Sequence, residues 1–427
     1  MLGLWLGCLL AWFQLVSGLV PPHGITRGDL GRGISPNLSW RWFFSNSSPG
    51  PLGTNGEALT VPLESNQDYL WTAQIQIGTP PVNFTVAVDT GSADMWIDAS
   101  VFNTSASQTF ATANQNFSIQ YDLGKVSGYV CTDNVQLQSL KVEKQVFGIA
   151  TNISGTNIPD GVQGVMGMAS QGLSQFHNKP FWQNLPLNQS LFSLYLRSAD
   201  HNKSEPPSSD GVLSLGTMDR NMFSDPLNYL PTANDDAWSV NFSGINVSNH
   251  IIQVSADTNA LIDSGTVLIG GPRDAIEEFY RQFDGSSEID DEPGFFSFPC
   301  VSIPDVHLAF GNAQYQLKPA DLILKEARYV PDDQDERPDS DDFKCIGTFF
   351  ATDPGDSWMI GGTFLKNVYT VFNQGTRQIG FAPLDTPSYQ SKSLPTGLPS
   401  GASFLFPTFW LFASFVVIAP LLPLWFL

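Results

Sequence analysis

Apolar and polar side chains alternate with a period of two through most of the chain. Residues 72–78 and 84–88 alternate in this way, and residues 117–121 and 369–372 continue the pattern. Alternation over a few residues, bounded by Gly and Asn, is typical of half-buried strands. The pattern therefore predicts an all-β architecture built from many short strands.

One segment has helical spacing instead. Ile276, Phe279, Tyr280 and Phe283 recur at intervals of three and four residues, which places them on one side of a helix. We predict a helix over residues 274–283 within the β body.

The N-terminal end departs from the β pattern. Residues 1–18 are apolar and finish in small residues, as a secretory signal peptide does, although a buried core helix is the alternative. Residues 19–66 are rich in Pro, Gly, Ser and Asn and have little periodicity, which is typical of a leader or pro-segment. These features predict a secreted protein, made as a zymogen.

The C-terminal end carries a second apolar segment, after a Ser/Pro-rich stalk over residues 386–403. Residues 404–427 contain no charged residue and are long enough to span a bilayer. Three prolines interrupt the segment and no Lys or Arg follows it, which favours a GPI-attachment signal over a transmembrane helix. Both alternatives anchor the protein to a membrane or cell wall. A third alternative is a tail that is neither a GPI-attachment signal nor a transmembrane helix. All three place the body outside the cytosol.

Asn-X-Ser/Thr sequons agree with secretion. Ten are present, all in the first 250 residues, and they are the glycosylation candidates: Asn37, Asn46, Asn83, Asn103, Asn116, Asn152, Asn188, Asn202, Asn241 and Asn246. Each alone is weak evidence because the tripeptide is common. Their number favours a secreted glycoprotein.

Four cysteines are encoded, and Cys8 lies in the predicted signal peptide. In an oxidising compartment Cys300 and Cys345 can form a disulfide bond, which closes a loop of about 45 residues and stabilises the fold by about 3–4 kcal/mol. Cys131 is then left over, and we expect a buried free thiol. Neither the cysteines nor the five histidines have the spacing of a metal site, so no metal and no cofactor is expected.

The formal net charge is -21 at pH 7. One dense acidic run, residues 332–342, is interpreted as a solvated loop. So acidic a chain disfavours nucleic acid as a partner. It suits a protein that works at low pH, where protonation relieves the repulsion between carboxylates.

An internal repeat carries the candidate chemistry. The sequence of residues 87–92, Ala-Val-Asp-Thr-Gly-Ser, returns at residues 261–266 as Leu-Ile-Asp-Ser-Gly-Thr. A single Asp-Ser/Thr-Gly-Ser/Thr motif is expected by chance in roughly one chain in fifty of this length. Two copies, each at the end of an apolar strand and half a chain apart, are far rarer. The repeat predicts two related lobes that each present one loop to the other.

The two loops would pair the carboxylates of Asp89 and Asp263. Carboxylates about 3 Å apart cannot both ionise cheaply, so they share a proton over an acidic range. One member then acts as a base and the other as an acid on a water that attacks a carbonyl group. A lone Asp in such a turn is as often structural; it is the duplication that favours catalysis.

Six further residues complete the predicted active-site loops: Thr90, Gly91, Ser92, Ser264, Gly265 and Thr266. The glycines permit the loops to approach closely. The hydroxyls of Ser92 and Thr266 can donate hydrogen bonds to the outer carboxylate oxygens. No metal, thiolate or Ser-His pair is needed.

With these motifs the sequence resembles the pepsin-like aspartic proteases, over about residues 68–385. The resemblance rests on the two Asp motifs, on Met95 and Trp96 after the first, and on segments 69–81, 117–128, 160–164, 192–196, 211–216, 358–361 and 381–383. It implies a bilobal fold with two pseudo-symmetric β lobes, residues 67–230 and 231–385, and a cleft between them. It also supports the disulfide bond between Cys300 and Cys345.

The resemblance implies an aspartic endopeptidase, acting at acidic pH on protein or peptide substrates, as a monomer and without a cofactor. Asp89 and Asp263 would be catalytic, and a flap bearing Tyr121, Asp122 and Leu123 would close over the substrate. Trp96 would help to line the cleft. A glycosylated, surface-anchored chain of this kind resembles fungal members of the family.

Some residues depart from the family pattern. Asp122 and Leu123 stand where a glycine and a hydroxyl residue are common, and Gln163 replaces an apolar residue under the first loop. The leader has three arginines and no lysine, which argues against a leader lysine that plugs the carboxylate pair. The chief alternative is a binding protein that keeps the cleft without catalysis, and a glycosidase, which also uses two carboxylates, is the second.

Overall fold

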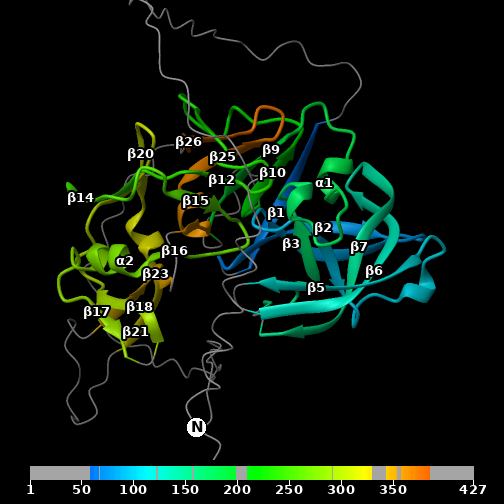
Figure 1. Cartoon of the computed structure of the whole chain (residues 1–427), viewed down its shortest axis with the longest axis horizontal. Coiled ribbons are helices and arrows are strands. Elements are labelled where there is room, and N and C mark those ends of the chain that lie inside the picture. Colours follow the sequence, from blue (N-terminus) through cyan, green and yellow to red (C-terminus); the bar gives the residue numbers. More distant parts are fainter. Residues whose placement is uncertain are drawn as a thin grey trace, which may run out of the picture. The chain divides into compact units, whose positions relative to one another are not determined.

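The computed structural model of the protein describes residues 58–66, 68–121, 124–155, 158–198, 209–290, 292–328, 343–352 and 357–384. Most of these residues lie in strands (Figure 1). The strands predicted by alternation are present, and residues 72–78, for example, fall in a strand that runs from Leu70 to Ile77. The prediction of a mostly β fold is confirmed.

The first half of the chain supplies ten strands and one short α-helix among the described residues: β1 (Leu59–Asn66), β2 (Leu70–Ile77), β3 (Val82–Asp89), β4 (Met95–Asp98), β5 (Ala111–Tyr121), β6 (Gly124–Leu137), β7 (Leu140–Ser154), β8 (Gly164–Gly167), α1 (Phe181–Asn184), β9 (Leu191–Leu196) and β10 (Gly211–Leu215).

The second half supplies the remaining strands and two α-helices: β11 (Asn228–Pro231), β12 (Ser239–Asn241), β13 (Gly244–Val247), β14 (His250–Ile252), β15 (Asn259–Ile262), β16 (Ile269–Pro272), α2 (Arg273–Tyr280), β17 (Ser287–Ile289), β18 (Glu292–Pro299), β19 (Val306–Phe310), β20 (Ala313–Leu317), β21 (Ile323–Arg328), β22 (Phe343–Gly347), β23 (Phe349–Thr352), β24 (Trp358–Ile360), α3 (Gly362–Leu365), β25 (Val368–Asn373) and β26 (Gln378–Pro383). Short 3-10 turns lie at Thr104–Ala106, Gln171–Leu173 and Pro319–Leu322.

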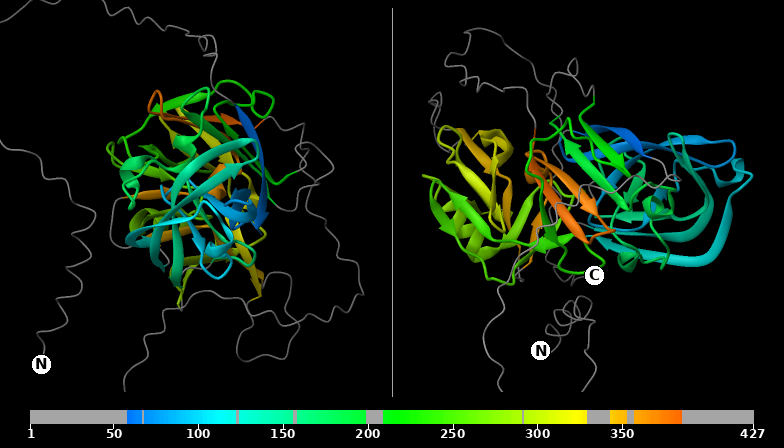
Figure 2. Two further views of the ribbon diagram at one scale, coloured as in Figure 1. Left: turned by 90° about the vertical axis from the view of Figure 1, so that its right-hand side faces the viewer. Right: turned by 90° about the horizontal axis from the view of Figure 1, so that it is seen from above.

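The two halves of the chain gather in two groups of strands, coloured blue to cyan and yellow in Figures 1 and 2. A continuous run of strands in the order β11-β26-β25-β9-β10-β1 joins them, with three strands from each half. At its centre β25 and β9 pair antiparallel. The repeat in the sequence therefore corresponds to two structural groups held together by one shared sheet.

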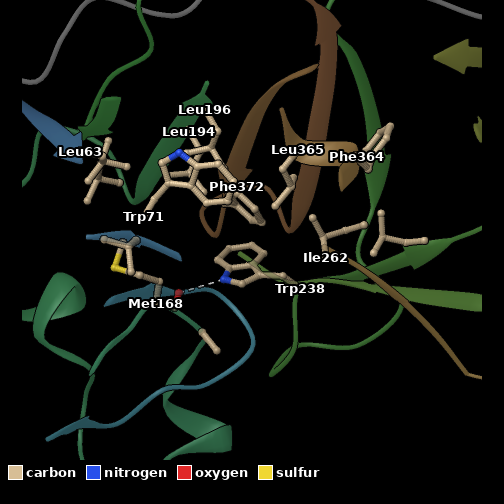
Figure 3. Close-up of a cluster of buried hydrophobic side chains, with 14 of the residues drawn as sticks. Leu63, Trp71, Met168, Leu194, Leu196, Trp238, Ile262, Phe364, Leu365 and Phe372 are labelled. Carbon is tan, nitrogen blue, oxygen red and sulfur yellow. Dashed lines mark hydrogen bonds between the residues drawn. The ribbon is translucent and has the colours of Figure 1, made fainter. Parts of the chain in front are cut away.

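Buried apolar side chains from both halves meet beside this shared sheet. In Figure 3, Trp71 of β2 and Leu194 of β9 lie close to Phe372 of β25. The indole N–H of Trp238 donates a hydrogen bond to the carbonyl oxygen of Met168 at 2.9 Å. The core thus continues from one half of the chain into the other.

The predicted helix is present but shorter than expected. α2 ends at Tyr280, and Phe283 lies in the turn that follows. The N–H of Phe283 donates a hydrogen bond to the Tyr280 carbonyl oxygen. Ile276, Phe279, Tyr280 and Phe283 are all buried, so the prediction that they share a buried side is confirmed.

The end of the predicted leader lies in the folded body. Residues 59–66 form β1, which pairs with β10 on one side and β2 on the other. Val61 and Leu63 are buried in alternation, but an alternation of so few apolar residues is too short to stand out in the sequence. The leader assigned to residues 19–66 therefore includes eight residues that the structure places in a strand.

A buried ion cluster connects the start of the body to its end. The ammonium of Lys366, directly after α3, lies 3.1 Å from a carboxylate oxygen of Asp68 and 2.9 Å from one of Asp321. Burial lowers the pKa of Lys366, but the two carboxylates outweigh burial and raise the pKa overall. The lysine therefore stays charged inside the protein.

The cysteines lie as the sequence predicts. Cys300 and Cys345 form a disulfide bond with a Cα–Cα distance of 5.2 Å, and Cys131 is a buried free thiol. Burial is the main cause that raises the pKa of the Cys131 thiol, and the charge of the nearby Asp133 raises it further. The thiol is therefore held in its neutral form.

Several predicted segments lie outside the described residues: the signal peptide, the leader up to residue 57, the acidic run, the stalk and the apolar tail. Within the part that is described, no helix is long and apolar enough to cross a membrane.

Candidate active site

Each repeated loop follows a strand that lies parallel to a second strand. Asp89 is the last residue of β3, which pairs parallel with β8, and Asp263 directly follows β15, which pairs parallel with β24. Both aspartates are buried, each with 7% of its surface exposed. The duplicated motif therefore sits in duplicated surroundings.

The two loops meet at their glycines. A Cβ atom at Gly91 would lie 2.6 Å from Cγ of Asp263, and one at Gly265 would lie 2.7 Å from Cγ of Asp89. No other amino acid has room at either position, because real Cβ atoms do not approach carboxylates so closely. Each glycine thus makes space for the carboxylate of the opposite loop, and the two carboxylates come together.

Thr90 and Ser264 connect the two loops through four buried hydrogen bonds. Each hydroxyl accepts the backbone N–H of the other residue, at 2.9 Å and 3.1 Å. Each also donates to a carbonyl oxygen in the opposite strand: Thr90 to Ile262 at 2.8 Å, and Ser264 to Val88 at 2.7 Å. This reciprocal set fixes one loop against the other.

Each of the two paired carboxylates receives two local hydrogen bonds. Asp89 accepts from the N–H of Gly91 at 2.9 Å and from the hydroxyl of Ser92. Asp263 accepts in the same way, from the N–H of Gly265 at 2.8 Å and the hydroxyl of Thr266 at 2.9 Å. These donors hold both carboxylates in place.

The surroundings raise the pKa of Asp263 well above its ordinary value. Burial is the largest cause, and the charge of Asp89 is the second. The hydrogen bonds from Gly265 and Thr266 act in the opposite direction but are outweighed. Asp263 therefore keeps a proton at pH values where an exposed aspartate has lost it.

Tyr121, which the resemblance assigns to a flap, is the last residue of β5 and lies within electrostatic range of Asp89. Its hydroxyl accepts a hydrogen bond from the indole N–H of Trp96 at 2.8 Å. Burial and the charge of Asp89 raise the pKa of Tyr121, so its hydroxyl stays neutral. Trp96 is only 1% exposed and supports the tyrosine from within rather than presenting a cleft wall. Asp122 and Leu123 lie outside the described residues.

Sequence reasoning missed a third buried aspartate near the pair. Asp94 accepts hydrogen bonds from the Ser174 hydroxyl and the Gln175 N–H, both at 2.6 Å. Burial raises the pKa of Asp94, although these hydrogen bonds oppose the shift. Its position between the first motif and Trp96, two residues from each, was the available signal.

The polar side chain of Gln163, under the first loop, also has a hydrogen-bond partner. Its carbonyl oxygen accepts the N–H of Thr85 at 2.9 Å. The backbone N–H of Gln163 in turn donates to the Thr85 carbonyl oxygen at 2.8 Å. This departure from the family pattern therefore leaves the strand that leads to Asp89 fully hydrogen-bonded there.

Seven of the ten sequons fall within the described residues. Five of their asparagines are exposed and two, Asn188 and Asn246, are partly buried; the exposed ones are Asn83, Asn103, Asn116, Asn152 and Asn241. The remaining three, Asn37, Asn46 and Asn202, lie outside the described residues.

No group of three or more His, Cys, Asp or Glu side chains is arranged to hold a metal ion in the described segments. What the two loops provide is a pair of adjacent carboxylates, and the pKa of one of them, Asp263, is raised by burial and by the charge of Asp89. Such a pair can activate a water molecule by acid–base chemistry alone.

Comparisons with known proteins agree with this geometry. The family model described as eukaryotic aspartyl protease matches residues 70–384. Pepsin A of Sus scrofa is 30% identical over 343 residues, covering 76% of this chain and 83% of the relative. Major aspartyl peptidase 1 of Cryptococcus neoformans var. grubii is 28% identical over 348 residues, covering 74% and 69%. Cathepsin E of Mus musculus is 30% identical over 342 residues, covering 76% and 83%. With its paired aspartates in duplicated loops, the chain belongs to the eukaryotic aspartyl protease family.

Proposed function

We propose that this aspartic endopeptidase hydrolyses peptide bonds at acidic pH through a water molecule held between Asp89 and Asp263. The observation that carries the proposal is the meeting of the two loops, in which each glycine leaves space for the opposite carboxylate. Asp263 holds the proton of the pair, since burial and the charge of Asp89 favour its neutral form.

In the proposed reaction the ionised carboxylate of Asp89 takes a proton from the water as its oxygen attacks the peptide carbonyl carbon. Asp263 gives its proton to the carbonyl oxygen, so that no unpaired charge accumulates on the tetrahedral intermediate. The hydrogen bonds from Ser92 and Thr266 keep the carboxylates aligned during this exchange. Proton transfer by positioned groups contributes about 10²–10⁴-fold to such a rate.

Cleavage of a quenched fluorescent peptide at pH 4, blocked by a statine-type inhibitor, tests the proposal. Asp89→Asn and Asp263→Asn should each lower kcat by at least about 10²-fold. Each variant should still fold, which a measurable unfolding midpoint would show. Asp305→Asn, a change of the same kind at an exposed position, should leave the rate unchanged. Inhibitor binding without cleavage by the unmutated protein would identify a binding protein instead.

We further propose that the protein is secreted as a glycosylated zymogen and attached to the cell surface. The support is the apolar N-terminal segment, the sequons and the uncharged apolar tail after a Ser/Pro-rich stalk. The GPI signal is favoured over a spanning helix because prolines interrupt the tail and no basic residue follows it. A monomeric state and a fungal type of surface attachment remain part of this proposal.

A further inference from the structure

A methionine lies against the second catalytic loop. Met359 is the middle residue of β24, and its neighbours Trp358 and Ile360 are buried in the core. Side chains alternate along a strand, so Met359 points to the other face, where it is only partly buried. Its Sδ lies 3.6 Å from the hydroxyl oxygen of Thr266.

The hydroxyl of Thr266 therefore has two possible acceptors. It donates to Oδ2 of Asp263 at 2.9 Å, and the Met359 sulfur is the second acceptor nearby. A thioether is a weak acceptor, so the hydrogen bond stays with the carboxylate. Oxidation would change this balance, because a sulfoxide turns the flexible apolar side chain into a polar one.

The equivalent position beside the first loop holds no sulfur atom. Val165 of β8 pairs with Ala87 as Met359 of β24 pairs with Leu261, so the two residues are equivalent in the repeat. A valine has no lone pair to compete for the hydroxyl of Ser92 and no sulfur to oxidise. The sensitivity is thus confined to the loop that carries Asp263.

We propose that Met359 is an oxidation site at which a hydroperoxide switches the peptidase off. With hydrogen peroxide, the O–O bond breaks and one oxygen forms an S–O bond with Met359. The sulfur is oxidised by two electrons, and the other oxygen leaves as water. The sulfoxide oxygen then accepts the hydrogen bond of Thr266, and Asp263 loses its outer donor. This inference rests on the proposed role of Asp263.

The other methionines of the described segments provide an internal comparison. Met95, Met166 and Met168 are buried. Met218 and Met222 are partly buried, but they pack in a separate cluster with Phe223. Mild peroxide should therefore oxidise Met359 together with Met218 and Met222, and only the first change should affect catalysis.

The test treats the active enzyme with increasing hydrogen peroxide at pH 5 and measures activity and the mass of each methionine peptide. The wild-type kcat should fall about tenfold or more, the loss expected when one hydrogen bond to a carboxylate is removed. The fall should follow the oxidation of Met359, and methionine sulfoxide reductases should reverse it. After peroxide treatment, Met359→Leu should keep most of the rate that it has before treatment. Met218→Leu should lose activity as the wild type does.

A further variant, Met359→Gln, places an amide oxygen near the hydroxyl of Thr266 and should lower kcat without peroxide. Equal inactivation of Met359→Leu and wild type would overturn the inference, and so would full activity of wild-type protein whose Met359 is oxidised. The second outcome needs no variant and stays decisive if a variant fails to fold. The untreated wild-type rate tests the proposed peptidase function separately.

Discussion

Replacing Thr90 by valine should weaken the connection between the two active-site loops, because it removes two of their four hydrogen bonds. Valine keeps the β-branched shape of threonine but lacks the hydroxyl, which donates to the Ile262 carbonyl oxygen at 2.8 Å and accepts the Ser264 N–H at 2.9 Å. Both backbone groups then lie in a buried site without these partners. The side chain itself is fully buried, so water cannot easily replace the hydroxyl.

The magnitude follows from the two backbone groups left without partners. Each buried donor or acceptor that loses its partner costs about 1–3 kcal/mol, and partial relaxation reduces the sum, so we expect Thr90→Val to lower the free energy of unfolding by about 3 kcal/mol. Ser264→Ala removes the matching bonds to Thr90 and Val88 and should have a similar effect. Because the hydroxyls share one network, the double variant should lose less than the sum of the two.

Urea unfolding at pH 5, followed by tryptophan fluorescence, measures these free energies, and kcat on a peptide reports the alignment of the carboxylates. Ser287→Ala, which removes an exposed hydroxyl, is the matched control and should change neither quantity. A loss below about 1 kcal/mol for Thr90→Val, together with additive effects in the double variant, would refute a shared network.

Four further predictions concern other parts of the chain. Lys366→Met should lower the free energy of unfolding by about 3 kcal/mol, because it leaves two carboxylates without their buried cation. Since the folded protein raises the pKa of this lysine, its contribution should be complete below about pH 10 and decline as the pH rises further, which unfolding curves at several pH values would show. Asn116→Gln should remove one glycan from the secreted protein by mass spectrometry, whereas Asn241→Gln should remove none, because the Asn241 amide already donates to two carbonyl oxygens at 2.7 and 3.1 Å. Truncation after residue 385 should release active enzyme into the medium. Release of the full chain by a phosphatidylinositol-specific phospholipase would support GPI attachment. Tail peptide that is still present in membranes would refute GPI attachment. Asp122→Gly should weaken a preference for Lys or Arg over acidic residues near the flap by about 0.5–1 kcal/mol, and an unchanged preference in a peptide library from pH 3 to 6 would show that the carboxylate only faces water.

The sequence was most informative where a local pattern decides the structure. The repeated motif was enough to predict that Asp89 and Asp263 pair, because a motif that occurs twice places two equivalent carboxylates in two equivalent loops. The spacing of Ile276 and Phe279 predicted the buried side of α2. The pairing of Cys300 with Cys345 rested also on the family resemblance, because three cysteines remain once Cys8 is excluded and a count alone does not choose between their pairings.

Contacts between distant parts of the chain were harder to predict. The partners of Asp94 lie 80 and 81 residues away, and nothing near Asp94 indicates them. Thr90 and Ser264 occupy the second position of each motif, where a hydroxyl gives no sign that its partner lies in the other half. Trp96 is a large aromatic side chain of the kind that lines clefts, and only its burial shows that it supports Tyr121.

The position of β1 limits how much of the N-terminal region can be removed. Because β1 fills the space between β10 and β2, a protein that began at residue 67 would expose the edge of β10, with unpaired N–H and C=O groups. Open edges of this kind pair with other chains and promote aggregation. A maturation cut, or the first residue chosen for recombinant expression, should therefore lie before Leu59.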